Sequence, residues 1–248
     1  MKIISKLLGA FKKVKRGKTS AVILCAGAST RFSSDKNENK QMAQVLGLPV
    51  IVRTILAFEC CDDIHEIVLV VRKEDLKRYE ALVKKCEFQK VSKIVVGGDT
   101  RQESALNGFD AISTKSSLVA IHDGARCLIT PEQISKVIEE AGIYSAATAA
   151  SKVTDTVKMA TKDGFISKTI DREYVWNVQT PQVFEVKLYA ASAYYSKENR
   201  FLATDDCMLV ENSGFKVKLV DTGRDNIKIT VKDDIALAEY ILTARGEE

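Results

Sequence analysis

Hydrophobic runs alternate with amphipathic segments along most of the chain, beginning at Ser20. The first run, residues 20–27, is continuously apolar and ends in small residues, which is typical of a fully buried parallel strand. Further strands are predicted at residues 65–75, 91–98, 117–126, 144–151, 216–221 and 226–231. Helices are predicted at residues 49–61, 75–86, 100–112, 130–141, 184–196, 204–212 and 233–245. This alternation predicts an α/β fold built on one open, mostly parallel sheet.

Two of the predicted helices begin with recognisable capping residues. Thr100 stands three residues before Glu103, which is the spacing of a capping box. Thr130 is followed by Pro131, and proline is favoured at the first position of a helix. These residues predict where the two helices start.

Residues 152–175 break the alternation of strands and helices. Two segments of alternating polarity flank Lys162–Gly164, a sequence typical of a hairpin turn. Because the hairpin is too polar for the core, we expect it to leave the main sheet as a β-arm. The sequence shows no repeat and no low-complexity linker, so residues 20–248 are predicted to form one domain after an extension of residues 1–19.

The extension differs sharply in charge from the domain. Residues 1–20 hold seven lysines and arginines and no acid, whereas the rest of the chain holds 30 basic and 33 acidic residues. The domain therefore has no positive excess that would favour nucleic acid as a partner. In the extension, apolar residues recur at helical spacing opposite the lysines, so it is either a weak membrane-surface contact or a solvated tail.

The composition favours a soluble, cytoplasmic protein. No run approaches the roughly 20 apolar residues of a membrane span, and Lys6 interrupts the stretch that a secretory signal would need. The six cysteines form no CxxC pair, and most lie in apolar runs as small hydrophobic residues. We therefore expect reduced thiols, without disulfides and without a zinc site.

Polar or glycine-rich segments mark four predicted strand boundaries. They are residues 26–31, 97–101, 122–126 and 224–228. In open α/β sheets, ligands bind outside the carboxyl ends of the strands, so these segments are candidates for a binding site. Small residues at 26–29 allow backbone N–H groups to approach a phosphate. The segment is neither a dinucleotide fingerprint nor a P-loop, which disfavours both of those classes.

A set of ordered motifs is more specific than any of these segments. They are "AGASTRF", "NKQ", "GGDTRQES", "HDGAR", "DTVK", "TIDREYVW", "QTPQVF", "FLATDD" and "NIKIT". In these motifs the chain resembles the bacterial 2-C-methyl-D-erythritol 4-phosphate cytidylyltransferases from about Ser20 to its end. The resemblance implies a doubly wound, Rossmann-like nucleotidyltransferase domain that forms a homodimer through its β-arm.

The resemblance also implies a reaction. The phosphate of methylerythritol phosphate attacks the α-phosphate of CTP, and 4-diphosphocytidyl-methylerythritol and pyrophosphate are formed with Mg²⁺ as cofactor. Such a site must bring two polyanions together and neutralise the charge on the transferring group. It needs no covalent nucleophile, which suits a chain with only two histidines.

Roles for individual residues follow from the same resemblance. Nucleotide binding is expected of Ala26, Gly27, Ala28, Ser29, Gly98, Asp99, Ser104, Asp123 and Gly124. Catalytic charge is expected of Arg31, Lys40, Arg172 and Lys228. Contacts to the methylerythritol phosphate are expected of Arg126, Thr156, Arg172 and Lys228, with Thr156 and Arg172 reaching the site of the partner subunit. Asp123 and Asp225 are the expected magnesium ligands, since Mg²⁺ commonly takes one or two carboxylates together with substrate phosphates.

The sequence departs from the family pattern in one loop. Arg31 and Lys40 stand about two residues further apart than is usual, and Asn39 replaces the proline that often precedes the lysine. Lys36 is a rival for the catalytic lysine, but only Lys40 precedes Gln41 as the motif requires. Cys127 also replaces a proline. Two alternatives stay open: a ribitol-5-phosphate cytidylyltransferase, which shares the CTP half, and a silent nucleotide-binding homologue, which only the longer loop supports.

Overall fold

The computed structural model describes residues 18–27, 31–32 and 39–247. Ala28, Ser29 and Lys36, which figured in the predictions above, lie outside the described residues, and so does nearly all of the basic extension. None of the helices in the described part of the chain has both the length and the apolar character needed to cross a membrane.

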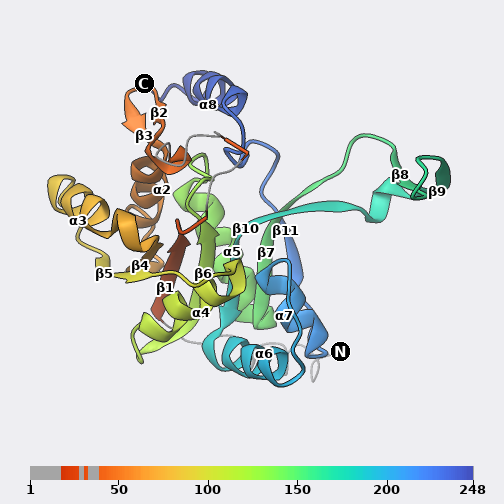
Figure 1. The fold of residues 1–248 in the computed structure, drawn as a ribbon, viewed down its shortest axis with the longest axis horizontal. Coiled ribbons are helices and arrows are strands. Elements are labelled where there is room, and N and C mark those ends of the chain that lie inside the picture. The colour runs from red at the N-terminus through yellow and green to blue at the C-terminus, as the bar shows by residue number, and fades with distance from the viewer. Residues whose placement is uncertain (1–17, 28–30, 33–38, 248) are drawn as a thin grey trace, which may run out of the picture.

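A seven-stranded sheet forms the centre of the molecule, in the order β11-β7-β10-β6-β1-β4-β5 (Figure 1). Its strands are β1 (Lys18–Leu24), β4 (Ile64–Val71), β5 (Val91–Val96), β6 (Ser116–Asp123), β7 (Ala146–Lys152), β10 (Trp176–Glu185) and β11 (Lys218–Asp221). Only β10 runs antiparallel to its two neighbours, β6 and β7. The prediction of a mostly parallel sheet is therefore confirmed.

Helices cover both faces of this sheet. They are α2 (Val50–Glu59), α3 (Leu76–Lys85), α4 (Arg101–Ala111), α5 (Pro131–Tyr144), α6 (Val186–Glu198), α7 (Asp206–Asn212) and α8 (Asp233–Ala244). The short elements are η1 (Lys40–Met42), η2 (Lys73–Asp75), η3 (Arg172–Tyr174), β2 (Gln44–Val45), β3 (Leu48–Pro49), β8 (Val157–Ala160) and β9 (Ile166–Ile170). Capping boxes open α4 at Thr100 and α5 at Thr130, so both predicted helix starts are confirmed.

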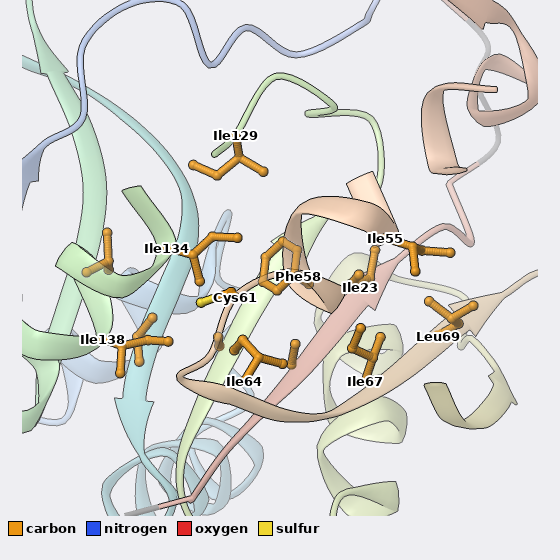
Figure 2. Close-up of a cluster of buried hydrophobic side chains, with 14 of the residues drawn as sticks. Ile23, Ile55, Phe58, Cys61, Ile64, Ile67, Leu69, Ile129, Ile134 and Ile138 are labelled. Atoms are coloured by element: carbon orange, nitrogen blue, oxygen red, sulfur yellow. The ribbon is translucent and has the colours of Figure 1, made fainter. Parts of the chain in front are cut away.

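The core is split by the sheet into two layers, because successive side chains of a strand point to opposite faces. Along β1, Ile23 packs with Phe58 of α2 and Ile134 of α5 in the first layer (Figure 2). Val22 packs on the other face, in a cluster that includes Tyr189 of α6. Apolar runs buried on both faces are what made these strands recognisable in the sequence.

Strand β10 was not predicted, and the reason is its composition. Its middle reads Gln-Thr-Pro-Gln, which lacks the apolar pattern of a central strand. Gln179, Thr180 and Gln182 are nevertheless buried, and their side chains are hydrogen-bonded. Internal hydrogen bonds take the place of apolar packing at the centre of this sheet.

The strand predicted at residues 226–231 is wrong. Residues 226–231 carry no strand in the structure and follow an irregular path instead. Ile229 donates its N–H to the Ala125 carbonyl and is fully buried beneath α8, in a third cluster. The apolar alternation therefore came from packing against α8 and its neighbours rather than from a strand ladder.

The β-arm is present as predicted. Strands β8 and β9 pair antiparallel, and the turn between them contains Gly164 with a positive φ of 89°. In Figure 1 the hairpin extends far from the sheet. Its apolar side chains are largely exposed in the single chain, among them Phe165 and Tyr174.

Candidate active site

A pocket of about 380 Å³ opens at the carboxyl ends of β1, β5 and β6. It collects nine of the predicted site residues: Ala26, Gly27, Arg31, Lys40, Gly98, Asp99, Ser104, Asp123 and Lys228. These residues come from four segments far apart in sequence. The rule that ligands bind beyond the strand ends therefore locates the pocket correctly in this fold.

The side of the pocket after β1 and β5 is built for close backbone approach. A Cβ at Gly97 would lie 2.5 Å from the Cβ of Ala26 and 2.7 Å from Ser104 Oγ, so only glycine lets the two loops meet. Ser104 Oγ accepts a hydrogen bond from the Gly98 N–H at 3.1 Å. Ser104 thus lines the pocket and also stabilises the loop that contains Gly97 and Gly98. Gly97 itself was not among the predicted site residues.

Asp123 is the central anion of the pocket. Its carboxylate lies 2.7 Å from Lys228 Nζ, 3.6 Å from Arg101 Nε and 3.9 Å from Arg126 Nε. Burial alone would raise the pKa of this carboxyl group, but Lys228, Arg101 and Arg126 together hold it well below its ordinary value. Asp123 is therefore ionised at neutral pH and holds three cations in place.

Lys40 faces the same pocket from η1. Burial first, and the nearby Lys228 ammonium second, lower the pKa of Lys40 to about 8. Arg31, which is exposed on the pocket wall, also lowers the pKa of Lys40, whereas Asp123 raises it. Neighbouring cations that lower the pKa of Lys40 indicate a site with affinity for anions.

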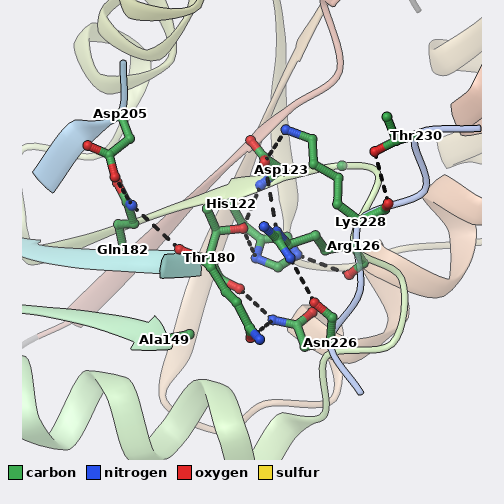
Figure 3. A network of polar contacts seen from close by, with 12 residues as sticks. His122, Asp123, Arg126, Ala149, Thr180, Gln182, Asp205, Asn226, Lys228 and Thr230 are labelled. Atoms are coloured by element: carbon green, nitrogen blue, oxygen red, sulfur yellow. Dashed lines mark hydrogen bonds and ion pairs between the residues drawn. The ribbon is translucent and has the colours of Figure 1, made fainter. Parts of the chain in front are cut away.

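A hydrogen-bonded chain fixes the loop after β6 (Figure 3). His122 Nε2 lies 3.2 Å from the Arg126 carbonyl, which can only accept, so this nitrogen carries the proton. Burial lowers the pKa of His122 to about 4, so the ring is neutral at pH 7 and Nδ1 accepts from the Thr180 hydroxyl at 3.0 Å. Thr180 Oγ1 in turn accepts the Asp123 N–H at 3.0 Å.

Strand β10, which carries Thr180, also fixes the segment that carries Lys228. Asn226 is fully buried, and its Nδ2 donates to Gln179 Oε1 at 3.0 Å and to the Thr180 carbonyl at 2.9 Å. Arg126 donates from Nη1 to the Asn226 carbonyl at 2.7 Å. Two residues beyond Asn226, Lys228 enters the pocket. Thr180 and Asn226 were not predicted as site residues, although both lie within the quoted motifs.

Arg101 is a pocket residue that the sequence reasoning missed. Its Nη1 lies 2.7 Å from Asp206 Oδ2, and its Nε faces Asp123. Asp206 is fully buried and also accepts the Tyr189 hydroxyl at 2.7 Å. Burial would lower the pKa of Arg101, but Asp206 and Asp123 raise it, so the guanidinium is a permanent cation of the pocket wall. Its place in the candidate segment 97–101, at the end of a predicted strand, was the available signal.

Several predicted residues lie outside the pocket lining. Gly124 is packed beneath it, where a Cβ would lie 2.5 Å from Cys25 Sγ. Arg126 lies behind Asp123 and supports the Asn226 backbone. Asp225 is turned toward Arg245, 3.4 Å away. Thr156 and Arg172 belong to the β-arm, where Arg172 Nη1 donates to the Thr154 carbonyl at 2.7 Å.

A magnesium ion would need carboxylate or phosphate oxygens as ligands in the pocket. In the described part of the chain, no three histidine, cysteine or acidic side chains are grouped as a metal site. Asp123 lines the pocket, whereas Asp225 does not. A single carboxylate fits Mg²⁺ when substrate phosphates supply the other oxygens. Asp123 is thus a suitable ligand for a metal that arrives with a phosphorylated substrate.

The fold and the pocket together define a class. A doubly wound α/β domain gathers cations and glycine loops at its strand ends, which is the arrangement of a nucleotidyltransferase. Comparison with known proteins gives the family. The model of the 2-C-methyl-D-erythritol 4-phosphate cytidylyltransferase family matches residues 19–244, and the chain belongs to this family.

Individual relatives agree with this assignment. The 2-C-methyl-D-erythritol 4-phosphate cytidylyltransferase of Caldanaerobacter subterraneus is 44% identical over 224 residues, which cover 90% of this chain and 98% of the relative. The enzyme of the same name from Pelotomaculum thermopropionicum is 38% identical over 92% of this chain and 95% of its own length. The crystal structure of 4-diphosphocytidyl-2C-methyl-D-erythritol synthase from Anaerococcus prevotii superposes with a TM-score of 0.81 at 32% identity, covering 93% of this chain and 98% of its own.

Proposed function

We propose that this chain transfers the cytidylyl group of CTP to 2-C-methyl-D-erythritol 4-phosphate, with release of pyrophosphate. Membership of the family supports the reaction. The single structural observation that carries the proposal is the ring of cations around Asp123 at the strand ends: Lys40, Arg101 and Lys228, with Arg31 on the wall. Such a ring fits two phosphorylated reactants better than it fits a neutral ligand.

The transfer needs positioning and charge rather than a protein nucleophile. An oxygen of the methylerythritol phosphate forms a bond to the α-phosphorus of CTP, and the bond from that phosphorus to the bridging oxygen breaks. The electron pair leaves with pyrophosphate, which is already an anion. The attacking phosphate is ionised at neutral pH, so no base is required. Arg31 and Lys40 neutralise the leaving group, and Lys228 holds the attacking phosphate.

The nucleotide is assigned to the side of the pocket formed by Gly98, Asp99 and Ser104. Gly98 and Asp99 are both exposed, and the Asp99 carboxylate offers acceptors to a base edge. Mg²⁺ bound with the CTP phosphates would be held by Asp123 and would neutralise phosphate charge. Asp123 would then share its carboxylate between the metal and Lys228, whose ammonium lies 2.7 Å away and would also be available to phosphate.

We also propose that the active form is a homodimer joined through the β-arm. The arm exposes Phe165 and Tyr174 by 70% and 78%, and a partner subunit would cover these apolar side chains. Arg172 lies on this arm, and its planar guanidinium suits a phosphate of the partner's site. In this arrangement Thr156 and Arg172 complete the acceptor side of the neighbouring pocket.

Two further assignments rest on the sequence alone. We place the protein in the cytoplasm, and for the basic extension, residues 1–19, we favour a solvated tail over a weak contact with anionic membrane surfaces. Flotation with phosphatidylserine vesicles distinguishes the two interpretations, because flotation through a membrane contact should disappear when residues 1–18 are deleted. Equal flotation of the truncated and full-length proteins would leave the solvated tail as the correct interpretation.

A substrate panel tests the proposed reaction. Purified protein is supplied with CTP, Mg²⁺ and either methylerythritol phosphate or ribitol 5-phosphate, and pyrophosphate release is followed by a coupled assay. We expect turnover with methylerythritol phosphate, a product of the mass of the cytidylyl adduct, and little turnover with the ribitol ester. Faster turnover of the ribitol ester would instead favour the rival acceptor. Binding of CTP without product from either acceptor would favour the silent homologue.

A further inference from the structure

We propose that Asn39 and Asp75 form a buried anchor that holds Lys40 in the pocket, so that both are positioning residues for the transfer. The inference deepens the proposed function and rests on it for the role of Lys40. It concerns the segment in which Arg31 and Lys40 are separated by eight intervening residues, of which 33–38 lie outside the described part.

The anchor consists of two hydrogen bonds from one side chain. Asn39 Oδ1 accepts the Gln41 N–H at 2.9 Å and so caps η1, the short helix that begins with Lys40. Asn39 Nδ2 donates to Asp75 Oδ2 at 3.1 Å. Asn39 is only 5% exposed, and Asp75 is 7% exposed. A buried amide that satisfies both of its ends in this way has one favourable orientation.

The other end of the anchor is rigid. Asp75 Oδ2 also accepts from Arg72 Nε at 2.6 Å, a charge-assisted bond. Arg72 directly follows β4, a strand paired on both sides by β1 and β5, and Asp75 directly precedes α3. The backbone of η1, which begins with Lys40, is therefore connected through the Gln41 N–H by three successive hydrogen bonds to the residue that follows β4.

Lys40 requires such an anchor because its position is electrostatically unfavourable. It is half-buried and is repelled by Lys228 and Arg31. An ammonium group on a flexible four-carbon side chain relieves such repulsion by moving into solvent unless its backbone is fixed. The Asn39–Asp75 bond fixes that backbone without placing a further charge on the pocket wall.

Reciprocal variants test the contact by steady-state turnover of CTP and methylerythritol phosphate. We expect Asn39→Ala to lower kcat about tenfold, as the loss of a buried hydrogen bond would. Asn39→Asp sets two carboxylates against each other and should lower kcat further. The double variant Asn39→Asp/Asp75→Asn restores one donor and the required acceptors, and should recover to within about threefold of the wild type. No recovery in the swap would overturn the anchor.

A double-mutant cycle tests whether the anchor acts through Lys40. If it does, adding Asn39→Ala to Lys40→Ala lowers kcat no further than Lys40→Ala alone. A full tenfold additional loss would show that Asn39 acts elsewhere and would overturn the proposal. Ser20→Ala is the matched control, because Ser20 is equally buried and hydrogen-bonded to Glu66 and Ser116 at the opposite end of β1. It should lower thermal stability and leave kcat unchanged.

A second readout does not depend on turnover. Competitive labelling with trace acetic anhydride, quantified by mass spectrometry, reports the pKa of Lys40 directly. Lys228 and Arg31 lower this pKa, whereas Asp123 and Asp234 raise it. Asn39→Ala should raise it from about 8 towards 10.5, because the released ammonium leaves its cationic neighbours. If the wild type shows no turnover but Asn39→Ala raises the pKa of Lys40, the anchor is supported and the proposed reaction is rejected. If the wild type is active but Asn39→Ala leaves the pKa of Lys40 unchanged, the anchor alone is rejected.

Discussion

The loop after β6 and the β-arm both carry predicted phosphate ligands, yet they are held in opposite ways. In the loop, His122, Thr180 and Arg126 fix the backbone around Asp123 through buried hydrogen bonds. In the arm, Arg172 is exposed and is held by a bond to its own hairpin. The first region is organised by the fold of a single chain. The second is expected to acquire its function only against a partner subunit.

The largest expected effect is the loss of activity when a cation that contacts Asp123 is removed. Lys228→Ala removes the closest cation of Asp123 and should lower kcat/KM by about 10²–10³-fold, as removal of a preorganised charge typically does. Steady-state kinetics measures this loss. Lys216→Ala is the control, since Lys216 is exposed near β11 and outside the pocket lining. Equal kinetics for the two variants would remove Lys228 from the machinery.

The arm should respond differently. Arg172→Ala is expected to raise the KM for methylerythritol phosphate about 10–100-fold, with the KM for CTP and thermal stability nearly unchanged. Mixing it with Lys228→Ala provides a sharper test. Each proposed site takes Lys228 from its own chain and Arg172 from the partner, so a hybrid dimer has one intact pocket out of two. Hybrids make up half of a statistical mixture, and about a quarter of wild-type activity should therefore return. No recovery after subunit exchange would place Arg172 in its own chain's site or outside both sites.

A smaller effect is expected at Thr180, whose hydroxyl group supports the loop after β6. Thr180→Val leaves the Asp123 N–H and His122 Nδ1 without their partner, and should destabilise the fold by about 1–3 kcal/mol. It should lower kcat about tenfold by loosening Asp123, whereas Thr180→Ser should restore both. Thermal unfolding and kinetics are measured on the same preparations. Loss of stability with an unchanged kcat would make Thr180 purely structural.

The smallest expected effect is a change in pH dependence. Because the pKa of Lys40 is lowered to about 8, kcat/KM should fall as pH rises through this value and the cation is lost. The effect on stability has the opposite sign: a lysine whose folded pKa lies below 10.5 destabilises the fold below pH 8, and stability is regained between about pH 8 and 10.5. Lys40→Arg should abolish the alkaline limb of kcat/KM. Retention of that limb would assign it to another group.

The sequence predicted most of the fold because most of its signals are local. Capping residues at Thr100 and Thr130 and the apolar run of β1 each depend on a few neighbouring positions. Strand β10 could not be recognised, since Thr180 and Gln182 are stabilised by partners distant in sequence. The same limit applies to the site. Residue type alone did not reveal that Arg101 would line the pocket while Arg126 would lie behind it.

The β-arm leaves and re-enters the sheet at a single place. Lys152 at the end of β7 and Trp176 at the start of β10 are directly paired neighbours. The hairpin between them is therefore an insertion whose excision need not disturb the register of any core strand. Joining the two residues with a tight turn should give a shortened polypeptide that folds as a monomer, keeps the CTP half of its pocket and lacks the acceptor contacts proposed for Thr156 and Arg172. Such a protein would separate dimer formation from nucleotide binding within one fold.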